Sequence, residues 1–107
     1  MEISFIRGDN HQERFRFKDF TGTVDDLFFT VKCKNRYIRI KKRLNDGINL
    51  NDDSWYYINF EPADTDNLPC DIEMEYDIQI ITSGEKYTVQ KGAFVLEEDI
   101  TTPDCEV

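Results

Sequence analysis

Residues 71–81 read DIEMEYDIQII, and apolar and polar side chains alternate without interruption along the first ten of them. Successive side chains of a β-strand point to opposite faces, so this period of two predicts a strand with one buried face. The inward, core positions are predicted to be Ile72, Met74, Tyr76, Ile78 and Ile80. The outward positions form a polar row of Asp71, Glu73, Glu75, Asp77 and Gln79.

Similar but shorter patterns predict strands on both sides of this stretch, at residues 3–6, 14–18, 27–33, 37–41, 48–51, 55–60, 87–89 and 94–96. Aromatic and β-branched residues, which favour pleated surfaces, are frequent in these segments. Gly92 interrupts the last of them and predicts a bulge or bend there. Their inward positions complete the predicted core with Phe15, Phe17, Leu27, Phe29, Val31, Ile58, Phe60, Tyr87, Val89, Phe94 and Leu96.

Turn residues separate the predicted strands. Asn45-Asp46-Gly47 and Ser83-Gly84-Glu85 are typical tight turns, and Pro62 can begin a short helical turn near residues 62–68 that Pro69 would end. Short strands at roughly ten-residue spacing indicate an all-β sandwich or barrel. A chain of 107 residues is expected to form one domain, over residues 1–100, followed by a flexible tail at residues 101–107.

The formal charge is -9, and it is unevenly distributed. Residues 1–43 hold 11 of the 13 Lys and Arg residues and 6 of the 22 acids, whereas residues 44–107 hold the other 2 bases and 16 acids. An acidic total argues against nucleic acids and anionic membranes as partners. The split predicts either pairing of basic strands with acidic ones or two oppositely charged faces.

The three cysteines, Cys33, Cys70 and Cys105, have neither disulfide-framework nor zinc-site spacing. We therefore expect no metal and no cofactor, and free thiols favour a reducing cytoplasm. The first residues do not resemble a signal peptide, and no apolar run approaches the roughly 20 residues needed to span a bilayer.

Catalytic groups are scarce in this sequence. His11, the one histidine, lies in the polar stretch Gly8-Asp9-Asn10-His11 and is interpreted as a solvated turn residue. Glu73 and Asp77 are four residues apart on one strand face, about 13 Å along a strand. Carboxylate pairs of glycosidases are separated by roughly 5–9.5 Å. We therefore expect that the chain is not an enzyme.

Two groups of side chains are candidates for an interaction surface. Trp55 and Tyr57 alternate with inward Tyr56 and would form an exposed aromatic pair, unless a loop covers them. Residues 32–43 contain no acid, and their outward Tyr37, Arg39 and Lys41 could bind a partner or only discourage edge-to-edge aggregation.

The acidic row offers a third candidate, centred on Glu73 and Glu75. It could dock a basic surface or contribute to a cation site, although a calcium site needs six to eight oxygens converging from a loop. The simpler interpretation is a solvated face whose carboxylates are compensated by lysines such as Lys32 on a neighbouring strand.

The order of several short motifs resembles that of small immunoglobulin-like β-sandwich modules encoded by tailed bacteriophages and prophages. Each motif alone is weak, but together they span nearly the whole chain in a consistent order. The motifs are Arg7-Gly8-Asp9, Phe15-x-Phe17, Asp26-Leu27 with Phe29-Thr30-Val31-Lys32, Ile58-x-Phe60-x-Pro62-x-Asp64-Thr65 with Leu68, Tyr76-Asp77-Ile78-Gln79, Tyr87-Thr88-Val89, Gly92-x-Phe94 and Asp99-Ile100-Thr101.

The resemblance implies an antiparallel, immunoglobulin-like sandwich of about 7–8 strands and a structural role in a virion, tail or baseplate. It implies partners among other structural proteins and copies of the chain itself, with synthesis in a bacterial cytoplasm. It transfers no catalytic residue, because the matching positions are core and turn positions. The alternative is a soluble module that binds a carbohydrate or cell-surface ligand, with Trp55 and Tyr57 as its platform.

Overall fold

The computed structural model describes residues 2–16, 24–33, 38–50 and 55–98. Phe17 of the predicted core, Tyr37 of the predicted interaction surface and the predicted tail lie outside these residues. The described strands are β1 (Glu2–Ile6), β2 (His11–Phe15), β3 (Asp26–Lys32), β4 (Ile38–Leu44), β5 (Gly47–Leu50), β6 (Tyr56–Phe60), β7 (Met74–Thr82) and β8 (Glu85–Glu97), with the helical turn α1 (Pro62–Thr65) between β6 and β7.

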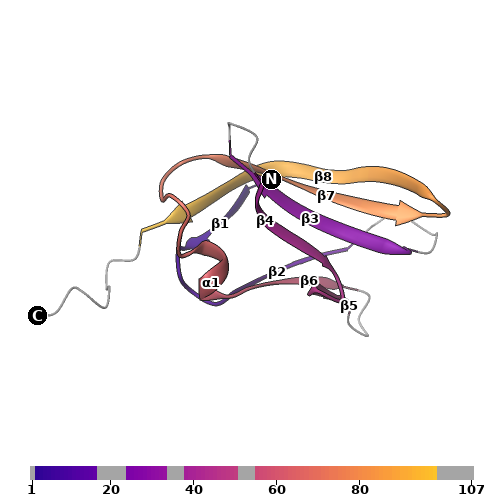
Figure 1. The fold of residues 1–107 in the computed structure, drawn as a ribbon, viewed down its shortest axis with the longest axis horizontal. Helices are drawn as coiled ribbons and strands as arrows, with labels where there is room; N and C mark the ends of the chain where they lie inside the picture. Colours follow the sequence, from indigo (N-terminus) through magenta and orange to yellow (C-terminus); the bar gives the residue numbers. More distant parts are fainter. Residues whose placement is uncertain (1, 17–23, 34–37, 51–54, 99–107) are drawn as a thin grey trace, which may run out of the picture.

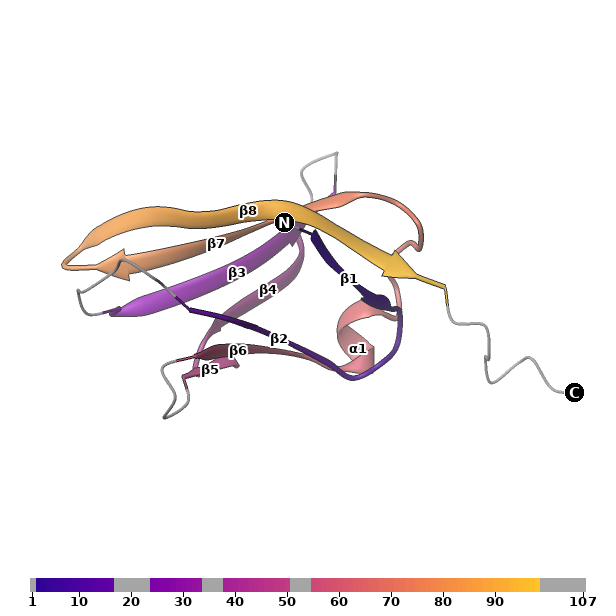
Figure 2. The same cartoon turned by 180° about the vertical axis from the view of Figure 1, so that it is seen from behind.

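The eight strands form one hydrogen-bonded sheet in the order β1-β8-β7-β3-β4-β5-β6-β2. The sheet folds over itself at β4 and β5, so that β8, β7 and β3 lie across from β6 and β2 (Figures 1 and 2). We call these groups the β7 layer and the β6 layer. The prediction of an all-β fold is confirmed, and so is the helical turn.

The finer prediction, an antiparallel sandwich of two separate sheets, is not confirmed. Hydrogen bonding continues from one layer to the other through the pairing of β4 with β5. That pairing is parallel, as is the pairing of β1 with β8. The sheet ends at β1 and β2, which are consecutive in the chain, and so approaches a closed barrel.

The core lies between the two layers and contains most of the predicted inward residues. Phe29 of β3 is fully buried, and its ring centroid is 5.6 Å from that of Phe60 in the β6 layer and 6.4 Å from that of Phe94 on β8. The predicted core residues confirmed as buried are Phe15, Leu27, Phe29, Val31, Ile58, Phe60, Met74, Tyr76, Ile78, Ile80, Phe94 and Leu96.

Three core predictions are wrong, because Ile72, Tyr87 and Val89 are 49%, 48% and 40% exposed. Ile72 precedes β7, and the positive φ of 58° at Asp71 breaks the alternation before the strand begins. Tyr87 is paired with buried Ile80 but lies near the turn end of the β7–β8 hairpin.

Val89 is exposed because the strand pairing skips it. Ile78 pairs with Gln90 and Gln79 pairs with Thr88, which leaves Val89 as an extra residue in β8. The bulge is therefore at Val89 and not at the predicted Gly92, which pairs regularly with Tyr76. An extra residue reverses the alternation of the side chains on either side of it.

The turn Arg7-Gly8-Asp9 is held by α1 and not by its own residues alone. The Gly8 amide donates a hydrogen bond of 2.8 Å to Oγ1 of Thr65, which is fully buried. Arg7 Nη1 donates to the carbonyl of Leu68 at 3.1 Å. Gly8 has a φ of +85°, which glycine adopts without strain. The tripeptide therefore has a structural role in joining β1, β2 and α1.

Replacing Thr65 with valine is expected to destabilise the fold by roughly 1–3 kcal/mol, because the Gly8 amide loses its acceptor at nearly constant side-chain volume. Thr65→Ser, which keeps the hydroxyl, is the control. The measurement is amide hydrogen exchange at Gly8, which should accelerate in Thr65→Val but stay slow in Thr65→Ser. Equal exchange rates in the two variants would contradict this assignment.

Candidate functional interaction faces

The outer face of the β7 layer carries two adjoining hollows, of about 390 and 400 Å³. Both are lined by Thr30, Lys32 and Asp77, so they form one continuous depression over β4, β3, β7 and β8. We call this depression the outer groove. It is open and shallow. Small molecules are usually bound in clefts that enclose them, so this shape is better suited to contact with another macromolecule.

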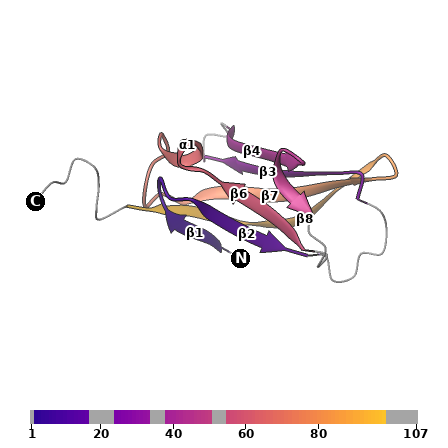
Figure 3. The same cartoon turned by 90° about the horizontal axis from the view of Figure 1, so that it is seen from below.

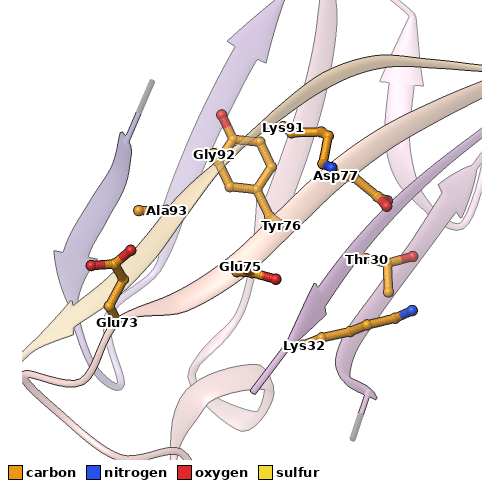
Figure 4. A pocket seen from close by; sticks show the side chains of 9 residues that line it. All are labelled: Thr30, Lys32, Glu73, Glu75, Tyr76, Asp77, Lys91, Gly92 and Ala93. Carbon is orange, nitrogen blue, oxygen red and sulfur yellow. The ribbon is translucent and has the colours of Figure 1, made fainter. Parts of the chain in front are cut away.

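One end of the outer groove is acidic. Glu73, Glu75 and Asp77 line it on the β7 side, and Gly92 and Ala93 of β8 add little side chain (Figure 4). Lys32 of β3 and Lys91 of β8 also line this end, so carboxylates outnumber lysines here by three to two. Alternation along β7 turns Tyr76 inward and leaves Glu75 and Asp77 outward, as predicted. The predicted site residues Glu73 and Glu75 are thus brought together here.

The other end is basic and apolar. Lys41 of β4 and Lys86 of β8 line it together with the side chains of Phe28, Ile38 and Ile81. Ile38 is 55% exposed because the β3–β4 register passes from Val31–Ile40 to Lys32–Ile38 and skips Arg39. Of the predicted interaction residues on β4, Lys41 lines the outer groove, whereas Arg39 is the bulged residue and its Nε contacts Cys33 Sγ at 3.3 Å.

Opposite charges face one another across the strands of the outer groove. Glu75 is in register with Lys32 on β3, and Asp77 is in register with Lys91 on β8. This arrangement, with acidic side chains of one strand opposite lysines of the next, is the simpler of the two interpretations given for the acidic row. Within the described residues, however, none of these four side chains forms an ion pair within 4 Å.

The described ion pairs lie elsewhere and hold the fold. Arg43 of β4 binds Asp26 of β3 at 2.7 Å, and this hydrogen bond lowers the pKa of Asp26 and raises that of Arg43. Lys42 of β4 binds Asp64 of α1 at 2.8 Å. The carboxylate of Asp64 also accepts the backbone amide of Glu61 at the start of α1. Lys42 and Arg43 of the basic stretch therefore stabilise the fold through ion pairs.

The outer face of the β6 layer has a different character. Trp55 and Tyr57 lie on this face and are half-buried, while Tyr56 is buried, as the alternation predicted. Arg14 of β2 and Arg16, the residue directly after β2, place their guanidinium carbons 4.6 and 4.8 Å from the centroid of the Trp55 ring. Figure 3 shows β2 beside β6, the pairing that brings these segments together. We call Arg14, Arg16 and Trp55 the arginine–tryptophan patch.

The two arginines of the patch were not among the predicted site residues. The alternation of Arg14-Phe15-Arg16 did indicate that both point outward. What it could not indicate is that β2 pairs with β6, which sets Arg14 opposite Tyr57 and brings both arginines to Trp55. A cation over an aromatic ring is stabilised by about 0.5–1 kcal/mol at exposed sites.

The interpretation of His11 as a solvated turn residue is wrong, because His11 is the half-buried first residue of β2. Its ring stacks on Phe5 with centroids 4.3 Å apart, and its Nε2 lies 2.6 Å from a carboxylate oxygen of Glu13. It lines none of the three hollows described on the surface. In the part of the chain that the structure describes, no three His, Cys, Asp or Glu residues are grouped so as to hold a metal ion.

Comparison with known proteins adds no assignment. No protein-family model matches the chain, and no curated protein matches it. Among the described residues, no helix has both the length and the apolar character needed to cross a membrane.

Proposed function

We propose that this protein is a non-catalytic assembly module that binds copies of itself and other structural proteins. The observation that carries the proposal is the outer groove, with carboxylates at one end and lysines at the other that form no ion pairs among the described residues. Surfaces of complementary charge steer association and set its register. The groove also contains the exposed apolar side chain of Ile38, which a partner could cover.

A place in a phage or prophage particle is the specific form of this proposal. It rests on the motif order, and two of those motifs contact one another: Gly8 of Arg7-Gly8-Asp9 binds Thr65 of Pro62-x-Asp64-Thr65. The motifs therefore have a joint packing role, as expected of a shared fold. Particles of this kind are built from repeated copies, and repetition favours symmetric contacts.

The carbohydrate-binding alternative is less well supported. A sugar platform needs an open aromatic face, whereas two guanidinium groups lie over the Trp55 ring. Displacing them would cost the cation–π contacts before any sugar could stack.

The test of the proposal is the mass of the protein in solution at low and high salt. We expect analytical ultracentrifugation to show a weight-average mass that rises with concentration at low ionic strength. The mass should fall toward that of the monomer near 1 M salt, where the Debye length is about 3 Å. A constant monomeric mass at every concentration and salt level would contradict self-assembly.

A further inference from the structure

We propose that copies of this protein associate head to tail, with the arginine–tryptophan patch of one copy docked against the acidic end of the outer groove of the next. This inference rests on the proposed function and names the two surfaces that meet. It also identifies the partner of the patch as a second copy of the chain.

The patch presents positive charge that the described residues do not neutralise. Arg14 and Arg16 are exposed, and their described contacts are with the Trp55 ring and not with a carboxylate. By contrast, Arg43 and Lys42 are each bound to an aspartate. Contact with the ring restricts both guanidiniums, so that less conformational entropy is lost when they bind a carboxylate.

The acidic end of the outer groove offers the complementary surface. The strand register sets Glu2 of β1 and Glu75 of β7 on either side of Ala93 of β8. Of these residues, Glu75 and Ala93 line the hollow together with Glu73, and the side chain of Ala93 is small (Figure 4). Guanidinium groups bind carboxylates in a planar, two-pronged geometry, which suits arginine better than lysine at such a surface.

The two surfaces lie on opposite outer faces of the folded sheet, one on the β6 layer and one on the β7 layer (Figures 1 and 3). A contact between different faces of identical subunits is heterologous. It leaves one free patch and one free groove in every pair, so it continues into a ring or an open array. This is the arrangement expected of a repeated structural part.

A two-fold alternative uses the outer groove alone. Rotation of a second copy would place its Lys41 and Lys86 against Glu73 and Glu75 of the first. The patch would then have no role. Charge reversal separates the two arrangements, because only the head-to-tail contact depends on Arg14 and Arg16.

The experiment compares the wild-type protein with three double variants by analytical ultracentrifugation at low salt. R14E/R16E reverses the patch, and E73K/E75K reverses the acidic end. K41E/K86E reverses the basic end of the groove and tests the two-fold alternative. It has the same formal charge of -13 as R14E/R16E, two units lower per substitution than the wild-type -9, so net charge cannot explain a difference between these two variants. All six positions are exposed, and circular dichroism checks that each variant is folded.

For head-to-tail contacts, R14E/R16E and E73K/E75K should each weaken self-association by about ten-fold or more, because like charges then meet. K41E/K86E should weaken self-association clearly less than R14E/R16E does at the same net charge, because Lys41 and Lys86 lie at the other end of the groove. An equimolar mixture of R14E/R16E and E73K/E75K should regain the larger species, since each variant then supplies the charge that the other lacks.

If K41E/K86E dissociates while R14E/R16E still assembles, the head-to-tail inference is overturned and the assembly function stands, through the two-fold contact. If the mixture of reversed variants stays monomeric, the inference is also overturned. If the wild-type protein itself is monomeric at low salt, the proposed self-assembly fails, and the head-to-tail contact fails with it.

Discussion

Replacement of Phe29 by alanine is expected to lower the free energy of unfolding by roughly 3–5 kcal/mol, the usual cost of truncating a fully buried phenylalanine. Phe29 lies on β3, and its ring meets Phe60 from the opposite layer at a centroid distance of 5.6 Å. It also meets Tyr76 of β7 at 5.5 Å. The truncation would therefore open a cavity between the layers, where backbone segments paired on both sides cannot collapse to fill it.

The measurement is urea unfolding followed by circular dichroism, with Phe28→Ala as the matched control. Phe28 is the adjacent residue of the same strand but points outward, where its ring lies 5.4 Å from the guanidinium of Arg43. The control should cost less than half as much. Equal losses of unfolding free energy in the two variants would mean that packing between the layers is not the main source of stability.

Replacement of Gly47 by alanine is expected to cost about 2–3 kcal/mol, for two reasons that act together. Gly47 has a φ of +96°, a conformation that residues with a side chain rarely adopt. An added Cβ would also lie 2.5 Å from Cδ of Lys42. Lys42 would have to move, and it is the residue that binds Asp64 of α1. The substitution should therefore loosen the connection between β4 and the helical turn.

Gly84 provides the matched control for this prediction. Its φ is +80°, and an added Cβ would meet nothing within 4 Å. Gly84→Ala thus introduces backbone strain without the clash, and the difference in the midpoint of thermal unfolding isolates the contribution of Lys42. In a Lys42→Ala background that difference should disappear. Its persistence there would show that the contact with Lys42 is not the cause.

The candidate site was only partly predictable from the sequence. Alternation correctly placed Glu75 and Lys41 on outer faces, and their charges marked them as surface residues. It could not show that β3 and β7 are neighbours, the pairing that sets Lys32 opposite Glu75 within the outer groove. The basic first part of the chain and its acidic second part therefore meet partly within one layer, where strands from the two parts pair.

The surroundings of Trp55 were also only partly predictable from the sequence. Its outward position follows from its place next to inward Tyr56. The two arginines that lie over its ring come from β2 and the residue after it, about 40 residues earlier in the chain. The sequence of residues 55–57 is compatible with either an exposed aromatic platform or a positively charged patch. The pairing of β2 with β6 decides between them, because it brings the two arginines to the Trp55 ring.

The sequence by itself determined the all-β class, most of the buried positions and the tight turns, because side-chain alternation and turn conformation depend on residues next to one another in the chain. The tertiary structure decided the strand order, the bulge at Val89 and the exposure of Tyr87. The strand order depends on which distant segments supply the neighbouring backbone hydrogen bonds, whereas the bulge and the exposure of Tyr87 depend on the register and the end of the β7–β8 hairpin. A bulge also shifts the pairing by one residue without requiring any particular side chain, so local alternation contains no sign of it.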